Sequence, residues 1–165
     1  MKVLVAYMSQ TGNTKKVAEA IYDEIPQPKE IKRVKDVNSL EDYDLSFLGF
    51  PMHGFGPDNQ VKNFLEKHVK NKKIALFVTH MAPMDAPPLQ DWIQKFKDAA
   101  VGADVLGVFD CQGQVSWIMK TIMRIAPDPQ VRAAAREDTS QGQPDAASIE
   151  RARIFTNEIL NKFNS

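Results

Sequence analysis

The sequence predicts a doubly wound α/β domain, in which a parallel sheet carries helices on both faces. Three observations support this fold class. Apolar runs of strand length alternate with segments of helical period, most connections are short, and 165 residues suffice for one domain with its own core. Neither an internal repeat nor a linker divides the chain, so we expect a single domain over residues 1–165.

Five segments predict the strands. Four are nearly continuous apolar runs, as expected of parallel strands covered on both faces: residues 2–7, 45–50, 73–79 and 104–111. The fifth, residues 30–37, is weaker and alternates between apolar and polar side chains. We therefore expect it at an edge of the sheet.

Four further segments predict helices, because their recurring residues follow a helical period and share one face. That face would cover the sheet. The sets are Val17, Ile21 and Ile25; Val61, Phe64, Leu65 and His68; Leu89, Trp92, Ile93 and Phe96; and Ala152, Phe155, Ile159 and Phe163.

Residues 112–143 form an insertion between the last strand and the last helix, far longer than an ordinary connection. Within it, residues 115–126 predict a short amphipathic helix and residues 127–143 an exposed loop. We weigh a lid packed on its own domain against peripheral contact with a membrane surface, a partner or an apolar substrate, and the short length favours the lid. One helix face would carry Val115, Ile118, Met119, Ile122 and Ile125, and the other Trp117, Lys120, Thr121 and Arg124.

Charge and cysteine content exclude several classes of protein. Lysine plus arginine number 21, as do aspartate plus glutamate, and we expect no nucleic-acid partner because such domains usually carry a basic excess. The single Cys111 excludes an intramolecular disulfide and a multi-cysteine metal site, which favours a reducing, cytoplasmic location. Cys111 itself is expected as a small buried residue. No signal peptide and no integral membrane segment is recognised.

The most informative motif follows the first strand and opens the first helix. It comprises Ser9, Gln10, Thr11, Gly12, Asn13 and Thr14. Hydroxyls and backbone N–H groups would converge there on the positive end of a helix dipole, which predicts a phosphate monoester site. The alternative is an ordinary helix cap made by Ser9, Thr11 or Asn13. Because the patterns G-x-x-x-x-G-K-[ST] and G-x-G-x-x-G are absent, we expect neither a nucleoside triphosphate nor a dinucleotide.

Three parts of the sequence resemble the flavodoxin family of FMN proteins. They are the Thr11-Gly12-Asn13-Thr14 motif, the loop from Gly49-Phe50-Pro51 to Gly56, and the segment from Gln143-Pro144-Asp145 into the last helix. The resemblance implies a flavodoxin-like five-stranded parallel sheet of order 2-1-3-4-5, with FMN at the carboxyl ends of the strands. Residues 117–124 also resemble the long-loop insertion of quinone-dependent protoporphyrinogen oxidases.

Open α/β sheets bind ligands beyond the carboxyl ends of their strands, where the strand order reverses. By resemblance, the backbone near Gly54 would meet flavin N5, and residues 79–82 would offer backbone donors to the pyrimidine edge. Alternatively, Gly54 and Gly56 only shape a turn. The residues predicted to hold the flavin ring are Pro51, Met52, His53, Gly54 and Phe55 after the third strand, and Thr79, His80, Met81 and Ala82 after the fourth.

The ring site departs from that of electron-carrier flavodoxins in two respects. Residues 79–82 include no Tyr or Trp, and the acidic rim of such carriers is missing. His53 and His80 could face each other, but no third ligand stands at a recognisable spacing, so we expect no metal. Either ring could instead relay a proton, because histidine titrates near neutral pH.

These features predict an FMN-binding redox protein that transfers electrons between a reductase and an acceptor, with the flavin supplying the chemistry. One alternative is an FMN-dependent oxidoreductase that acts on a quinone, a porphyrinogen or a similar planar substrate. Another is a flavin-free interaction module. No residue is an obvious catalytic acid, base or nucleophile.

Overall fold

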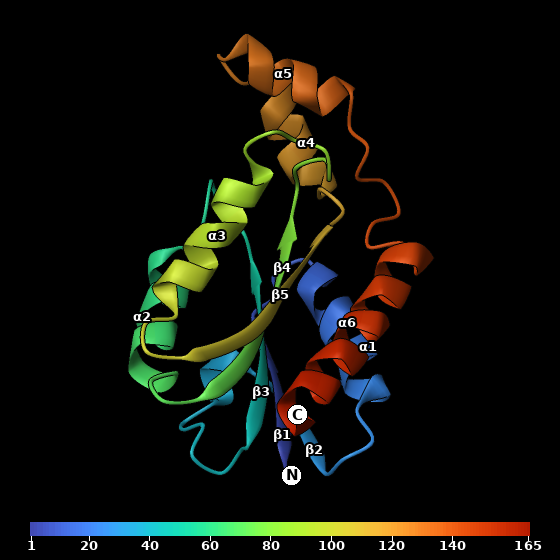
Figure 1. Cartoon of the computed structure of the whole chain (residues 1–165). Helices are drawn as coiled ribbons and strands as arrows, with labels where there is room; N and C mark the ends of the chain where they lie inside the picture. The colour runs from blue at the N-terminus through green and yellow to red at the C-terminus, as the bar shows by residue number, and fades with distance from the viewer.

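The computed structural model describes all 165 residues. Its centre is a parallel five-stranded sheet of order β2-β1-β3-β4-β5, which confirms the predicted flavodoxin-like topology (Figure 1). The strand order reverses at β1, so the carboxyl ends of β1 and β3 open onto the expected ligand position. The strands are β1 (Val3–Tyr7), β2 (Lys29–Arg33), β3 (Leu45–Pro51), β4 (Lys73–His80) and β5 (Asp104–Gln112).

The three central strands are buried, as their continuous apolar runs predict. β2 lies at one edge and is half-buried, which confirms the prediction from its weaker pattern. It ends at Arg33, earlier than predicted, because residues 34–36 form a 3₁₀ turn that buries Val34 and Val37 beneath the sheet. β5 forms the opposite edge and is only partly buried, unlike the expectation from its apolar run.

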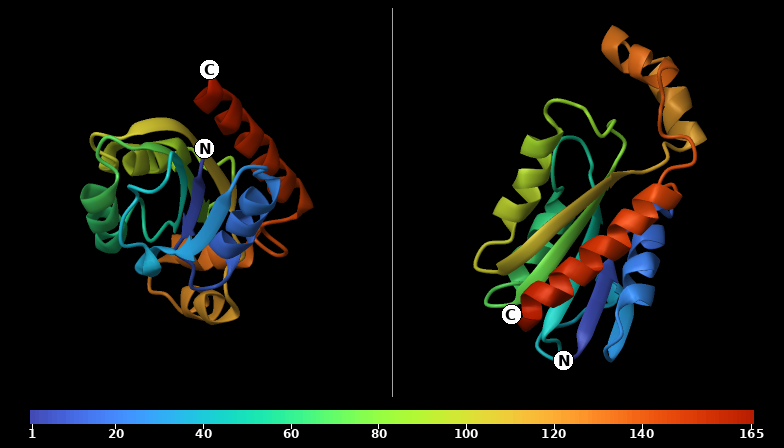
Figure 2. Two further views of the ribbon diagram at one scale, coloured as in Figure 1. Left: turned by 90° about the horizontal axis from the view of Figure 1, so that it is seen from below. Right: turned by 45° about the vertical axis from the view of Figure 1, so that its right-hand side comes forward.

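Helices cover both faces of the sheet (Figure 2). α1 (Asn13–Glu24) and α6 (Ala146–Asn164) pack on one face, and α2 (Asn59–His68) and α3 (Leu89–Ala99) pack on the other. Alternate residues of each strand join one core or the other: Val3 and Val5 face α1 and α6, whereas Leu4 and Ala6 face α2 and α3. All four predicted helices are present.

The insertion projects from the carboxyl edge of the sheet as an arm, which we define as residues 114–143 (Figures 1 and 2). It contains α4 (Trp117–Arg124), which was predicted, and α5 (Pro129–Arg136), which was not. The prediction of a loop over residues 127–143 is therefore wrong. α5 forms because Asp128 caps it by accepting from the amide of Gln130 at 2.8 Å, Pro129 suits the first turn, and Ala133–Ala135 favour helix. Across the whole chain, no helix combines the length and the apolar character needed to cross a bilayer.

Candidate functional site

The loops predicted to bind phosphate and flavin ring converge at the carboxyl edge of the sheet, under the base of the arm. There they enclose a pocket of about 320 Å³, which we call the cofactor pocket. Phe55 and Ala82 line an adjoining pocket instead, and Ser9 and Gly12 belong to the first loop without lining either. The predicted residues that line the cofactor pocket are Gln10, Thr11, Asn13, Thr14, Pro51, Met52, His53, Gly54, Thr79, His80 and Met81.

The amino end of α1 is open. Gly12 precedes the helix with a left-handed φ of 93°, and no side chain caps it. The Ser9 hydroxyl accepts from the Gly12 amide at 3.1 Å, but the amides of Asn13, Thr14 and Lys15 have no acceptor in the chain. The alternative of an ordinary side-chain cap is therefore wrong. Three free amides at the positive end of a helix form a ready anion site.

Side chains of this loop are fixed by contacts with other elements. The hydroxyls of Thr14 and Thr79 lie 2.8 Å apart, both buried, so one donates to the other and one hydroxyl proton remains available. Asn13 Nδ2 donates to Thr11 Oγ1 at 3.1 Å and to the Gln114 carbonyl at 3.0 Å. The loop is thus tied to β4 and to the arm before any ligand binds.

Two lysines follow the open end of α1. Lys15 pairs with Glu19 at 3.4 Å, and Lys16 donates to the Pro144 carbonyl at 2.5 Å. Positive charge in the first turn opposes the helix dipole, which costs a few tenths to about 1 kcal/mol unless an anion lies nearby. A bound phosphate would remove this cost.

The loop after β3 carries an oriented histidine. His53 Nδ1 lies 2.8 Å from Asp58 Oδ2, and Asp58 also caps α2 by accepting from the Val61 amide at 2.9 Å. Burial acts to raise the pKa of the Asp58 carboxyl, but hydrogen bonds from His53 and Val61 outweigh it and hold that pKa below its usual range. Gly54 has a φ of 71°, which favours glycine at this turn.

An aromatic pair that the sequence did not predict stands beside this loop. Phe55, 66% exposed, packs on Trp92 of α3 with ring centroids 4.8 Å apart. Trp92 follows the apolar period of its helix, so the sequence assigned it to the core, but it lines the pocket next to Phe55. Trp92 thus places an aromatic ring beside Phe55, whereas residues 79–82 include no Tyr or Trp.

His80 is held at both ring nitrogens. Nδ1 lies 2.9 Å from the Ala82 carbonyl and Nε2 lies 3.1 Å from Asp110 Oδ2, and the ring is almost fully buried. Because a carbonyl only accepts, Nδ1 carries a proton. His80 and His53 thus bind different carboxylates, and no group of three or more potential ligand side chains is placed to hold a metal ion.

Cys111 lies next to this region on β5 and is fully buried. Burial raises the pKa of its thiol to about 12, with a smaller contribution from Asp110. The thiol is therefore protonated at neutral pH and unsuited to nucleophilic attack. The expectation of a small buried residue is confirmed.

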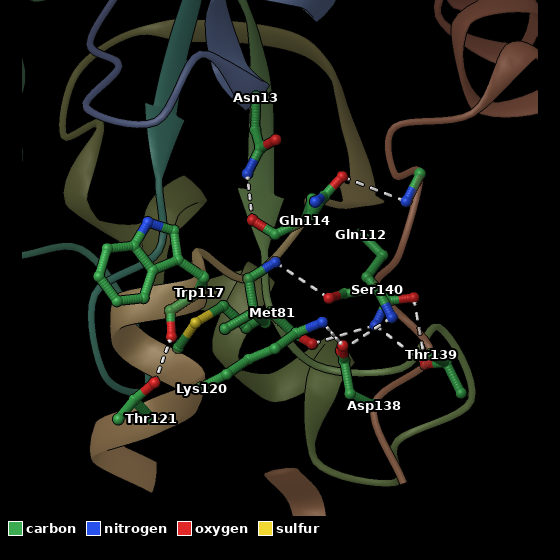
Figure 3. A network of polar contacts seen from close by, with 12 residues as sticks. Asn13, Met81, Gln112, Gln114, Trp117, Lys120, Thr121, Asp138, Thr139 and Ser140 are labelled. Carbon is green, nitrogen blue, oxygen red and sulfur yellow. Dashed lines mark hydrogen bonds and ion pairs between the residues drawn. The ribbon is translucent and has the colours of Figure 1, made fainter. Parts of the chain in front are cut away.

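A polar network fixes the base of the arm to the sheet (Figure 3). Gln112 Nε2 donates to the Met81 carbonyl and to Thr139 Oγ1, each at 3.1 Å. The Val115 amide donates to the buried hydroxyl of Ser140 at 2.9 Å, and Gln114 and Gln143 join through a backbone hydrogen bond of 3.0 Å. Both ends of the arm are thereby held beside the ring loops.

The two faces of α4 differ from the prediction. Met119, Lys120 and Met123 line the pockets, and Lys120 forms an ion pair with Asp138 (Figure 3). Burial acts to raise the pKa of Asp138, but the bonds from Lys120 and Ser140 outweigh it and lower that pKa. The predicted pairing of Trp117 with Lys120 on one face is therefore wrong. The exposed face carries Trp117, Ile118, Ile122 and Ile125.

Charge on the arm is uneven. Arg124, Arg132 and Arg136 have no carboxylate within ion-pair distance. The arm contains four cationic and three anionic side chains, so its net charge is +1, and the rest of the chain, with 17 against 18, has a net charge of −1. A neutral chain therefore carries an excess of positive charge on its arm.

The second pocket, of about 420 Å³, lies between the ring loops and the arm, and we call it the arm pocket. Ten of its 18 lining residues are hydrophobic, which is typical of a small-molecule site. It adjoins the cofactor pocket through five residues that line both: Met52, Gly54, His80, Met81 and Val115.

Solved structures share this fold over the whole chain or most of it. Oxidised flavodoxin 2 from Bacillus cereus has a TM-score of 0.64 and 19% identity, covering 98% of this chain and 99% of its own. A flavodoxin from the domain Archaea has a TM-score of 0.62 and 17% identity, with both chains fully covered. A flavoprotein from Lactobacillus acidophilus NCFM, solved in complex with FMN, has a TM-score of 0.55 and 24% identity, covering 66% of this chain and 92% of its own.

Sequence comparisons identify the family. The chain is 36% identical over 176 aligned residues to the flavodoxin-like domain-containing protein BilS of Clostridioides difficile (strain CD3), covering 98% of each chain. None of these similarities supports the resemblance of the insertion to protoporphyrinogen oxidases. The flavodoxin domain model matches residues 4–157, so this chain belongs to the flavodoxin family.

Proposed function

We propose that this chain is an FMN-binding redox protein that passes electrons between a reductase and an acceptor. The observation that carries the proposal is the open amino end of α1, whose free amides form one end of a pocket walled by both predicted ring loops. Family membership and the FMN-bound flavoprotein neighbour support FMN as the cofactor.

The residues present fit FMN. The amides of Asn13, Thr14 and Lys15 would hold the phosphate, assisted by the hydroxyls of Ser9, Thr11 and Thr14 and by the side chains of Gln10 and Asn13. At Gly12 the position of a β-carbon is open, with no atom within 4 Å, so a ligand can approach the backbone closely. The ring would lie against residues 51–55 and 79–82. Bound there, FMN supplies one- and two-electron chemistry.

The protein's own groups would hold the ring loops and exclude water. Asp58 orients His53, and the contacts of His80 with Ala82 and Asp110 fix the loop after β4. Val115 and Met119 of the arm close one side of the cofactor pocket. A rigid environment that partly excludes water tunes the reduction potential of a flavin, because it sets the free-energy cost of adding charge to the ring.

We also propose that the electron donor or acceptor is another protein in the cytoplasm, where the lone Cys111 would remain reduced. The near balance of charge on the arm, with four cationic and three anionic side chains, supports a partner that need not carry the basic docking surface that acidic carriers use. Contact of residues 115–126 with a membrane surface or a partner is a further proposal, supported by the exposed apolar face of α4.

Purification of the full chain in the presence of FMN tests the main proposal. We expect a yellow protein that retains flavin through gel filtration and bleaches with dithionite. Supplied with NADPH and a flavodoxin reductase, it should increase cytochrome c reduction above the rate seen with reductase alone. A colourless protein that ignores added FMN would instead support the flavin-free interaction module.

A second candidate is an FMN-dependent oxidoreductase acting on a small planar compound. The arm pocket favours it, because a mostly apolar hollow of about 420 Å³ stands beside the ring loops. Reduction of a quinone by the dithionite-reduced protein, with rates that saturate with quinone concentration, would favour this function over protein-to-protein transfer.

A further inference from the structure

We propose that the arm pocket binds a flat, largely apolar and uncharged compound that carries carbonyl oxygens, as quinones do. The inference rests on the proposed function, since bound FMN would be the neighbour of this compound. It adds residues of the arm and of α3 to the ring loops, which line both pockets. The pocket is built by the arm together with the loop after β4 and helix α3.

The walls of the arm pocket suit a ring system. Four alanines and a proline leave space without long side chains: Ala82, Pro83, Ala86, Ala134 and Ala135. Phe55 and Trp92 add aromatic rings, and Met81 and Met123 are adaptable apolar side chains. This mostly apolar lining favours a ligand with a large apolar surface.

The polar groups of the pocket select against a negatively charged ligand. Glu137 and Asp138 both line it, so a ligand carboxylate would meet two like charges. The side-chain amide of Gln112 is already used by Met81 and Thr139. Lys120 is the one cation in the lining. Its ammonium has three protons, and its ion pair with Asp138 leaves at least one of them free to donate to a ligand. A neutral carbonyl oxygen is the acceptor that this combination fits.

The position of the pocket would bring its occupant next to the flavin. Met52, Gly54, His80, Met81 and Val115 line both pockets, so the two pockets are adjacent. Conversion of a quinone to its hydroquinone takes two electrons and two protons, which two-electron-reduced FMN can supply as it returns to the oxidised form.

Trp92 provides a direct reporter of binding. The chain has two tryptophans, and Trp117 is 76% exposed on the outer face of α4, away from the pocket lining. In a Trp117→Phe background, the remaining tryptophan emission comes from Trp92. We expect menadione, added to the oxidised FMN-loaded protein, to quench this emission in a saturable manner without releasing flavin. 2-Naphthoate, a ring of similar size with a carboxylate, should bind at least tenfold more weakly.

Two neighbouring alanines of α5 give a matched pair of variants. Ala134 lines the pocket and Ala133 does not, and both are exposed. Ala134→Phe should fill the pocket and raise the dissociation constant of menadione at least tenfold, whereas Ala133→Phe should leave it unchanged. Both should retain FMN, as read from the visible spectrum.

The outcomes separate this inference from the proposed function. Absence of saturable quenching in the FMN-loaded protein, equal affinity in the two alanine variants, or binding only after FMN is removed would each overturn the arm pocket as a quinone site. Failure to retain FMN would overturn the proposed function, and the Ala134 and Ala133 variants would then test the pocket in the flavin-free chain.

Discussion

At the scale of single residues, the phosphate loop is held ready for its ligand by contacts that do not use its helix amides. Thr14 bonds to Thr79, Asn13 bonds to Thr11 and to the arm, and the Ser9 hydroxyl occupies only the Gly12 amide. Binding of phosphate would then need little reordering of the chain, and less ordering entropy would oppose it.

A carboxylate in this loop should abolish flavin retention. We expect Gly12→Asp to raise the dissociation constant of FMN at least tenfold, about 1.4 kcal/mol, because the new charge would lie next to the phosphate. FMN fluorescence quenching measures this. Gly142→Asp is the control, since Gly142 also has a left-handed φ, 79°, and open space at its β-carbon position, but lies in the arm. An equal loss of FMN affinity in the two variants would indicate backbone strain rather than charge repulsion.

The buried thiol yields a prediction on reactivity and pH. Cys111 should not react with a disulfide reagent in the native protein at pH 8, and should react at once in guanidinium chloride. The pKa is raised to about 12 from 9.0, so the contribution of Cys111 to stability is complete below pH 9 and is lost as pH rises toward 12. Cys111→Ala should flatten the fall of unfolding free energy over that interval. Rapid native labelling would contradict this account.

The sequence predicted which loops meet at the candidate site, but not the hydrogen-bond and packing partners of their side chains. Loops 9–14, 51–55 and 79–82 meet at one edge because parallel strands place their carboxyl ends there. The position of Trp92 in the pocket lining was not predicted, because its helical period is the same whether it faces the core or a pocket rim. The contact of His53 with Asp58 was not predicted either, because it depends on a turn shaped by Gly54 and Gly56.

At the scale of elements, the structure of the arm depends on contacts that its sequence pattern does not reveal. Its first helix has an apolar period, but which face turns inward depends on the ion pair of Lys120 with Asp138, 18 positions later in the chain. Its second helix is short and polar, and only its cap at Asp128 and its alanines indicate it. The sheet and its four covering helices were predictable because their patterns are long and buried.

The base of the arm should depend on one buried hydroxyl. Ser140→Ala leaves the Val115 amide without its acceptor, at a cost of about 1–3 kcal/mol, which would loosen the arm before the sheet. Hydrogen exchange should accelerate in residues 114–143 but not in β1, β3 or β4. Thr121→Ala should have little effect, because that exposed hydroxyl bonds within α4. If hydrogen exchange accelerated uniformly along the chain in Ser140→Ala, the hydrogen bond of Ser140 would not stabilise the arm alone.

At the scale of the whole molecule, ligand binding at the sheet edge should stabilise the domain. FMN at one hundred times its dissociation constant raises the free energy of unfolding by about 2.7 kcal/mol. For a chain of this size, that gain corresponds to a rise in Tm of roughly 5–11 °C. Riboflavin at the same concentration should give a much smaller rise, since it lacks the phosphate that the α1 amides would bind. Equal shifts measured by differential scanning fluorimetry would contradict the phosphate loop.

With a net charge of +1 on the arm and −1 on the rest, the neutral chain has a small separation of charge between these two parts. The arm, which projects from the sheet and lines both pockets, is the positive part, and the rest of the chain is the negative part. A molecule without net charge feels no net pull in a uniform field, but it experiences a torque. Near an acidic partner, such a torque would turn the arm and the adjoining pockets toward the encounter, so that orientation, rather than attraction, would raise the fraction of productive collisions.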